Sequence, residues 1–175
     1  AAGECAADIH PNDHVNMGQS SNDVIPSTIQ VAAALMLHDS LLPSLLHLAE
    51  TIDIKAEELE NTVKTGRTHL MDAMPVTFGQ ELACWSQQVR SNIKRIRNAA
   101  KRVRKLPLGG SAVGTGINAH PEFGDRVAAI LEQLTTVKFR AASNPFEGIS
   151  SQDVSVELSG ELKTLACSLM KISND

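Results

Sequence analysis

Three short stretches of the sequence gather polar side chains that can bind an anion or move a proton. They lie at residues 10–22, 65–75 and 109–118 and read HPNDHVNMGQSSN, TGRTHLMDAMP and GGSAVGTGIN. Each is expected at the end of a helix, where free backbone N–H groups and the helix dipole favour carboxylates and phosphates. The three stretches are therefore candidate anion sites.

The first stretch ends in three consecutive residues with hydrogen-bonding side chains, Ser20, Ser21 and Asn22. Ser and Asn are preferred N-cap residues, so capping of the following helix explains one or two of them. Three such residues after a polar loop leave anion binding open as a second explanation.

Two histidines earlier in this stretch, His10 and His14, are four residues apart. On a helix this spacing places two histidines on one face, where they can ligate a metal. Pro11 and Asn12 lie between them and indicate a turn instead. We therefore expect no metal site in this stretch.

The second stretch contains Thr68, His69 and Asp72, which allow two interpretations. They can form a loop cap in which Leu70 and Met71 half-bury His69. Alternatively, His69 is placed for proton transfer, because histidine is the side chain whose proton is labile near neutral pH. The residues alone leave both interpretations open.

The third stretch contains a GxG sequence, Gly114-Thr115-Gly116. A dinucleotide-binding loop would need a strand before it and a third glycine at a fixed offset. A long helix is expected before this loop, and the third glycine is missing. Dinucleotide binding is therefore not predicted.

The composition favours a single helical domain. The chain has 175 residues, of which 42% are hydrophobic and only 3% aromatic, with no tyrosine. This length supports one sizeable core, and the dominance of aliphatic residues favours helices packed on helices over a β-sandwich. We predict an all-α fold built as a bundle of long helices.

Charge and hydropathy limit the partners of the protein. The formal net charge of -4 argues against nucleic acid, which requires a basic surface. No stretch is expected to reach the roughly 18 apolar residues of a membrane span. One local basic stretch is expected to be the solvated or partner-facing side of a helix; it contains Lys94, Arg95, Arg97, Lys101, Arg102, Arg104 and Lys105.

The three cysteines, Cys5, Cys84 and Cys167, are widely spaced and form no CxxC sequence. Neither a disulfide framework nor a zinc site is indicated. Cys84 and Cys167 fall in apolar helical patterns, and we expect them to be small buried side chains. This cysteine usage is typical of the cytoplasm or another reducing compartment.

Hydrophobic periodicity predicts the order of the helices. Long helices are expected at 24–37, 44–64, 76–105 and 154–172, with a shorter helix after His120 and irregular structure at 135–149. The first is apolar over most of its surface and is expected to be buried on most sides. Pro43 is expected to interrupt or kink it, Gly66 to end the second helix, and Pro75 to open the third.

The ends of the sequence predict a fragment of a longer polypeptide, truncated at both ends. No initiator Met begins the chain, and the last periodic pattern reaches Ile172 without a stop signal before Asp175. Long helices with apolar seams, at 76–105 and 150–172, then need partners from other subunits or from missing segments. We expect the chain to associate in solution.

Taken together, the three stretches resemble the class II fumarases of the fumarase and aspartase superfamily. The matching motifs are HPNDHVNMGQSSNDV, GRTHLMDAMPVTFGQE and GGSAVGTGIN followed by HPEF, in the family's order and spacing over nearly the whole chain. Aspartases tend to show STND and a Gln in place of the histidine. Argininosuccinate and adenylosuccinate lyases match less well at all three motifs.

The resemblance implies reversible anti addition of water to fumarate, giving (S)-malate in the tricarboxylic acid cycle, without a metal or organic cofactor. It implies that Ser20, Ser21 and Asn22 bind a substrate carboxylate, that Thr68 makes a further contact, and that His69 belongs to the proton relay. Such a reaction builds a doubly charged aci-carboxylate, which neutral donors and cations stabilise.

The resemblance also implies a second dicarboxylate site near the surface, matched by His10, Asn12 and Asp13. Ala7 stands where some family members have a basic residue of this site. Family members are homotetramers of longer subunits, and each active site takes residues from three of them. The implied location is the cytoplasm or, in a eukaryote, the mitochondrion.

Two family segments have no counterpart in this sequence: the flexible Gly-Ser-Ser loop with the serine thought to act as base, and an earlier Ser-Gly-Thr segment. The chain therefore resembles the central helical domain alone and is expected to be inactive by itself. Two alternatives remain: a sibling lyase that releases ammonia from aspartate, and a non-catalytic helical assembly module whose polar loops only cap helices.

Overall fold

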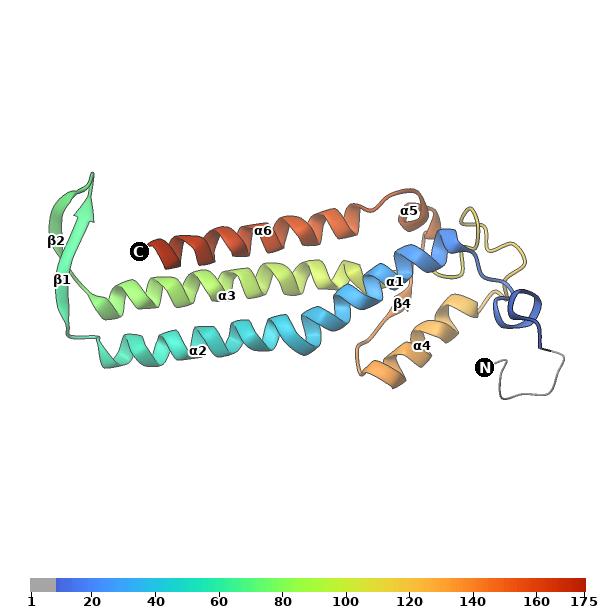
Figure 1. Ribbon diagram of the computed structural model, residues 1–175, viewed down its shortest axis with the longest axis horizontal. Helices are drawn as coiled ribbons and strands as arrows, with labels where there is room; N and C mark the ends of the chain where they lie inside the picture. Colours follow the sequence, from blue (N-terminus) through green and yellow to red (C-terminus); the bar gives the residue numbers. More distant parts are fainter. Residues whose placement is uncertain (1–8) are drawn as a thin grey trace. The chain divides into compact units, whose positions relative to one another are not determined.

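The computed structural model describes residues 9–175, which divide into two compact units (Figure 1). One unit contains residues 9–35 and 101–156, and the other contains Met36–Ala100 and Glu157–Asp175. Cys5 and Ala7 lie outside the described residues. The prediction of a fold built from long helices is confirmed, although four short strands accompany the helices.

The second unit is a bundle of long helices with a hairpin at one end. Its elements are η2 (Leu37–Leu41), α2 (Leu42–Glu58), β1 (Val63–Thr68), β2 (Met71–Thr77), most of α3 (Phe78–Val103) and most of α6 (Asp153–Asn174). Figure 1 shows α2, α3 and α6 running side by side. Buried residues of α2, α3 and α6 form the core: Leu45, Ala49, Val89, Ile93, Ile96, Leu158 and Leu165.

Polar contacts also join the helices of this bundle. The amide Nδ2 of Asn92 on α3 donates to Ser168 Oγ on α6 at 2.9 Å. The Ser86 hydroxyl donates to the carbonyl of Ala49 on α2 at 3.3 Å. Because both Asn92 and Ser86 are buried, these contacts satisfy polar groups that would otherwise destabilise the core.

The first unit contains shorter elements around the polar stretches. These are η1 (Pro11–Val15), α1 (Ser21–Met36, up to Leu35 in this unit), β3 (Lys105–Leu106), α4 (Phe123–Thr135), β4 (Arg140–Ala141) and α5 (Pro145–Ser150). Strands β3 and β4 form a parallel pair. Residues 135–149 are therefore only partly irregular. The apolar core of the unit includes Val103, Leu106, Ala128, Val137 and Phe139.

The burial of α1 is opposite to the prediction. Its buried residues are Asp23, Pro26, Ser27, Gln30 and Ala34. In contrast, the side chains of Ile25 and Ile29 are 56% and 48% exposed. The apolar pattern predicts a helix correctly, but it does not show which face the neighbouring elements cover. The prediction that this helix is buried on most sides was wrong.

The expectation of no membrane-length apolar stretch also needs correction. By length and composition, the helical stretch Ser21–Glu58 is apolar enough to cross a membrane. That criterion also selects core helices of soluble proteins. Within this stretch, Pro43 interrupts the regular α-helix as predicted. The segment just before it, η2, is a π-helix, and Pro43 lies at the start of α2. Proline lacks an N–H and clashes with the carbonyl four residues earlier.

The second polar stretch, 65–75, is not a loop at a helix end. Helix α2 ends at Glu58, before Gly66, and β1 and β2 pair as an antiparallel hairpin. Helix α3 begins at Phe78 instead of Pro75 because Thr77 and Gln80 form a reciprocal capping box.

Cys84 and Cys167 are both exposed, so the prediction that they are buried was wrong.

Candidate active site

The start of α1 carries the three polar residues of the first stretch. The Ser20 hydroxyl accepts a hydrogen bond from the backbone N–H of Asn22 at 3.2 Å, so Ser20 caps the helix. Ser21 and the side chain of Asn22 are exposed. Capping therefore uses one of the three predicted residues and leaves two available to a ligand.

Asn22 joins the first polar stretch to the third. Its side-chain Nδ2 donates to the backbone carbonyl of Ala112 at 2.8 Å, across 90 residues of sequence. A primary amide has two N–H donors. One N–H of Asn22 therefore holds the 109–118 loop, and the other is left to donate to a carboxylate.

The 109–118 loop has a tightly folded backbone that requires glycine. At Gly114 the φ angle is +108°, and an added Cβ would lie 2.6 Å from the ring of Phe146. The N–H groups of Gly114 and Gly116 both donate to the carbonyl of Gly110, at 2.9 and 3.0 Å. These glycines fold the loop against α5, and no nucleotide-binding role is needed to explain them.

The tip of the hairpin places His69 in a strained, exposed turn. Thr68 pairs with Met71, which leaves His69 and Leu70 as a two-residue connection. Their φ angles are +52° and +60°, as in a type I′ turn, where Asn-Gly is strongly preferred. Each non-glycine residue with this backbone costs about 1–2 kcal/mol. Such strain is often found at functional sites.

Contacts within the hairpin hold this turn. Arg67 donates to the carbonyl of Leu70 at 3.2 Å and pairs with the carboxylate of Asp72 at 3.1 Å. Leu70 itself is 94% exposed, and His69 is also exposed. The structure therefore does not support a cap in which Leu70 and Met71 half-bury His69.

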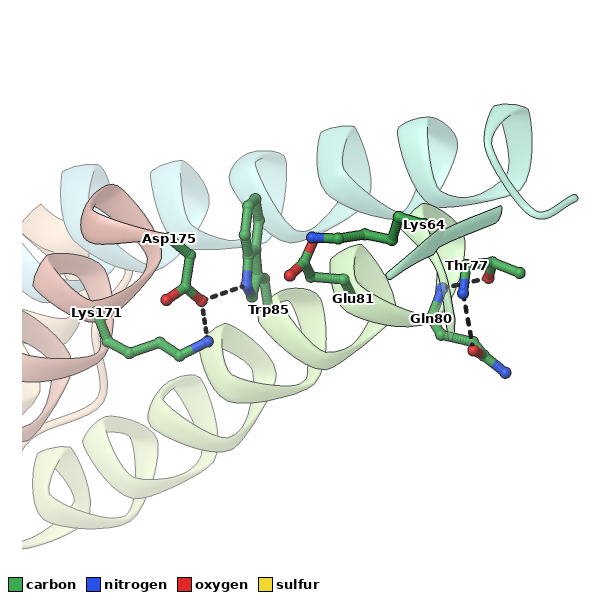
Figure 2. Close-up of polar contacts among 7 residues, drawn as sticks. All are labelled: Lys64, Thr77, Gln80, Glu81, Trp85, Lys171 and Asp175. Carbon is green, nitrogen blue, oxygen red and sulfur yellow. Dashed lines mark hydrogen bonds and ion pairs between the residues drawn. The ribbon is translucent and has the colours of Figure 1, made fainter. Parts of the chain in front are cut away.

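The base of the hairpin is fixed to the start of α3 (Figure 2). The N–H of Thr77 donates to Gln80 Oε1 at 3.0 Å, and the N–H of Gln80 donates to Thr77 Oγ1 at 3.1 Å. Lys64 on β1 pairs with Glu81 on α3 at 2.6 Å, and its ammonium lies 4.9 Å from the ring centroid of Phe78. The orientation of the hairpin thus depends on the first turn of α3.

A neighbouring contact joins α3 to the end of α6. The indole N–H of Trp85 donates to Asp175 Oδ2 at 3.2 Å, and Lys171 pairs with the same carboxylate (Figure 2). The Lys171 hydrogen bond holds the pKa of Asp175 below its ordinary value of 3.8, and the same contact raises the pKa of Lys171. These groups stabilise the bundle next to the hairpin.

The residues of the expected second site lie on the exposed turn η1. The His10 ring Nδ1 accepts a hydrogen bond from the N–H of Asp13 at 3.2 Å and lies 3.1 Å from the Asp13 carboxylate. The first contact needs an unprotonated Nδ1, whereas an ion pair needs a protonated one. Asn12 is exposed. His10 and Asp13 therefore interact mainly with each other.

The structure brings some predicted site residues together and assigns others to a different unit. Ser20, Ser21 and Asn22 lie in the first unit, where Asn22 contacts the 109–118 loop, whereas Thr68 and His69 belong to the second unit. Among residues 9–175, no group of three or more His, Cys, Asp or Glu side chains is placed to hold a metal ion.

The basic stretch contributes to a hollow of about 390 Å³ in the first unit. Its lining consists of Lys101, Arg102, Arg104, Lys105, Lys138 and Arg140. Strand pairing places Lys105 opposite Arg140. The sequence could not show this grouping, because the pairing joins residues 35 positions apart.

The sequence of the chain matches a known family of enzymes along nearly its whole length. A family profile described as lyase matches residues 2–175, so the chain belongs to the lyase family. It is 54% identical over 167 residues to the class II fumarate hydratase of Xylella fastidiosa; this region covers 95% of this chain and 35% of that protein. The resemblance to class II fumarases inferred from the three motifs is confirmed.

Other relatives carry the same family name. The mitochondrial fumarate hydratase of Homo sapiens is 48% identical over 167 residues, which cover 95% of this chain and 33% of that protein. The class II fumarase of Schistosoma mansoni has a similar structure, with a TM-score of 0.93 and 38% identity; it covers 96% of this chain and 38% of that chain. The chain spans about a third of the length of the curated relatives it matches.

Proposed function

We propose that the chain is the central helical part of a longer class II fumarate hydratase, which reversibly adds water to fumarate to give (S)-malate in the tricarboxylic acid cycle. One observation carries this proposal: identity of 54% to a class II fumarate hydratase extends over 95% of the chain. All three polar stretches match that enzyme family in their order and spacing.

In this proposal Ser20, Ser21 and Asn22 bind one carboxylate of the substrate. The exposed Ser21 hydroxyl and the remaining N–H of Asn22 are available donors at the positive end of α1. Thr68 makes a further contact from the hairpin. Neutral donors placed in this way stabilise negative charge that develops in the transition state without reacting with the substrate.

His69 belongs to the proton relay of the same site. Its exposure at the hairpin tip leaves the imidazole accessible to groups outside the hairpin. The base that removes the proton from carbon is supplied by a segment outside this chain. We infer that the enzyme is a homotetramer, in which the hairpin of one subunit and the α1 start of another contribute to one active site.

The proposed second dicarboxylate site consists of His10, Asn12 and Asp13. The carboxylate of Asp13 lies beside His10 and repels an anion. We expect this site to bind dicarboxylates more weakly than the active site.

The proposed location of the enzyme is the cytoplasm or, if the source is a eukaryote, the mitochondrion, as in the names of the Schizosaccharomyces pombe and Homo sapiens relatives.

The test is an assay of the full-length parent protein on fumarate, with and without ammonia. Hydration to malate without ammonia is expected. Formation of aspartate only when ammonia is present would establish the ammonia-lyase alternative. If neither product forms and no dicarboxylate binds near Asn22, the chain is an assembly module. The 175-residue chain alone should show no hydration, and turnover by it would contradict the proposed requirement for a base from outside.

A further inference from the structure

Asp23, the residue after the proposed carboxylate-binding group, is completely buried. Its relative exposure is 0%, although it lies in the first turn of α1 next to exposed residues. Burying a carboxylate is costly unless hydrogen bonds replace its lost hydration. The surroundings of Asp23 must therefore supply donors, and three backbone N–H groups do so.

These donors come from both sides of the candidate site. Asp23 Oδ2 accepts hydrogen bonds from the N–H groups of Gly109 at 3.0 Å and Ser111 at 2.9 Å. Asp23 Oδ1 accepts one from the N–H of Ser20 at 3.3 Å. We call these three hydrogen bonds the Asp23 network. It joins residues 86 and 88 positions apart in the sequence.

The backbone of the loop is shaped to fit this carboxylate. The φ angles of Gly109 and Ser111 are +99° and +53°, and both N–H groups converge on one oxygen. Backbone turns of this kind form concave sites for anions. Here the anion is an internal side chain, so the loop conformation depends on the charge of Asp23.

We propose that Asp23 is a positioning residue, which fixes the side chain of Asn22 for the substrate carboxylate by holding the 109–111 turn against the start of α1. Asn22 donates to the carbonyl of Ala112, directly after the turn. Movement of the turn therefore moves the amide that is proposed to bind substrate. The catalytic part of this inference rests on the proposed function, whereas the structural part does not.

The decisive variant is Asp23→Asn in the full-length protein. It keeps the size of the side chain but replaces an acceptor with an N–H₂ group, which cannot accept from a backbone N–H. At least one bond of the Asp23 network is then lost. Asp125→Asn is the matched control, because Asp125 is an exposed carboxylate in the first turn of α4 in the same unit.

The first measurement is amide hydrogen exchange of a peptide covering residues 107–118. The Asn oxygen can still face the two loop N–H groups, but a neutral amide accepts more weakly than a carboxylate. Exchange at Gly109 and Ser111 should therefore increase on the order of tenfold, with no change in Asp125→Asn. This measurement needs no activity, so it tests the network even if the parent protein does not hydrate fumarate. Unchanged exchange in a folded Asp23→Asn protein would overturn the proposal.

The second measurement tests whether Asp23 acts through Asn22. Asp23→Asn should lower kcat/KM for fumarate by about 100-fold, the typical effect of a small misplacement of a binding group. Asn22→Ala should cause a similar loss, and the double variant should be little worse than either single variant, because coupled residues are not additive. Independent, multiplying losses would show that Asp23 only stabilises the fold and would overturn the positioning role.

Discussion

The start of α1 and the tip of the β1–β2 hairpin hold their polar groups in opposite ways. Asn22 is held by a hydrogen bond to Ala112, 90 positions away, and lies next to the completely buried Asp23, which binds the same loop. His69 is held by a two-residue turn and by its neighbour Arg67, in the open. The comparison indicates that the position of Asn22 depends on long-range contacts, whereas that of His69 depends on local backbone geometry.

The largest effect is expected at the hairpin tip, where one substitution should lower activity without lowering stability. His69→Asn in the full-length parent removes the imidazole and should lower kcat for fumarate hydration by about 10² to 10⁴-fold. The temperature of thermal unfolding should be unchanged or slightly higher, because Asn tolerates a positive φ better than His. Kinetics and calorimetry on the same preparation measure both. An unchanged kcat would remove His69 from the proton relay.

The next effect concerns the base of the hairpin. Thr77→Ala removes the hydroxyl that caps α3 and should lower the free energy of unfolding by about 1 kcal/mol. Because β2 ends at Thr77, hydrogen exchange in the hairpin should also increase, while exchange in residues 109–118 stays the same. A matched Gln80→Ala variant removes the other half of the capping box. An equal increase in hydrogen exchange in the hairpin and in residues 109–118 would show that the two regions do not respond independently.

A smaller, opposite effect is expected beside the α1 start. Ser111 Oγ is buried and makes no hydrogen bond within residues 9–175. Ser111→Ala keeps the backbone N–H that binds Asp23 and removes this hydroxyl, so stability should rise by about 1 kcal/mol. Chemical denaturation measures the change. A loss of stability would show that the hydroxyl has a partner in the intact protein.

The smallest effect is a pH-dependent signal next to the hairpin. The pKa of Asp175 is lowered by Lys171, so its contacts persist at neutral pH and are lost only as the pH falls below the ordinary value of 3.8. Trp85 is the only tryptophan in the chain and donates to this carboxylate. Its fluorescence should be constant above about pH 4 and change below it. An Asp175→Asn chain should lack this step.

The helices were predictable because local periodicity determines them. The seams of α3 and α6 give their buried faces directly, as at Val89, Ile93 and Leu165. The hairpin was not predicted, because Val63–Thr68 and Met71–Thr77 are mostly exposed and lack a regular apolar alternation. One available signal was overlooked: Thr77 and Gln80 have the spacing of a capping box, which marks the start of α3.

The site was only partly predictable for a different reason. Ser20, Ser21, Asn22, Thr68 and His69 were found from residue type and motif, and their substrate-binding or catalytic roles remain predictions. Asp23 was missed because its partners, Gly109 and Ser111, are joined to it only by folding. In the same way, the exposed Ile25 shows that periodicity identifies an apolar face without showing what covers it.

The buried carboxylate beside the α1 start has an electrostatic consequence for any bound dianion. Residues 9–22 and 109–118 contain no lysine or arginine, so the charge of Asp23 is matched there only by dipoles, and hydroxyl or amide donors add no net positive charge. A dianion bound close to the Asp23 carboxylate is repelled by it. Offsetting this repulsion requires a cation carried by some other segment, and affinity for the dianion should fall when that lysine or arginine is removed.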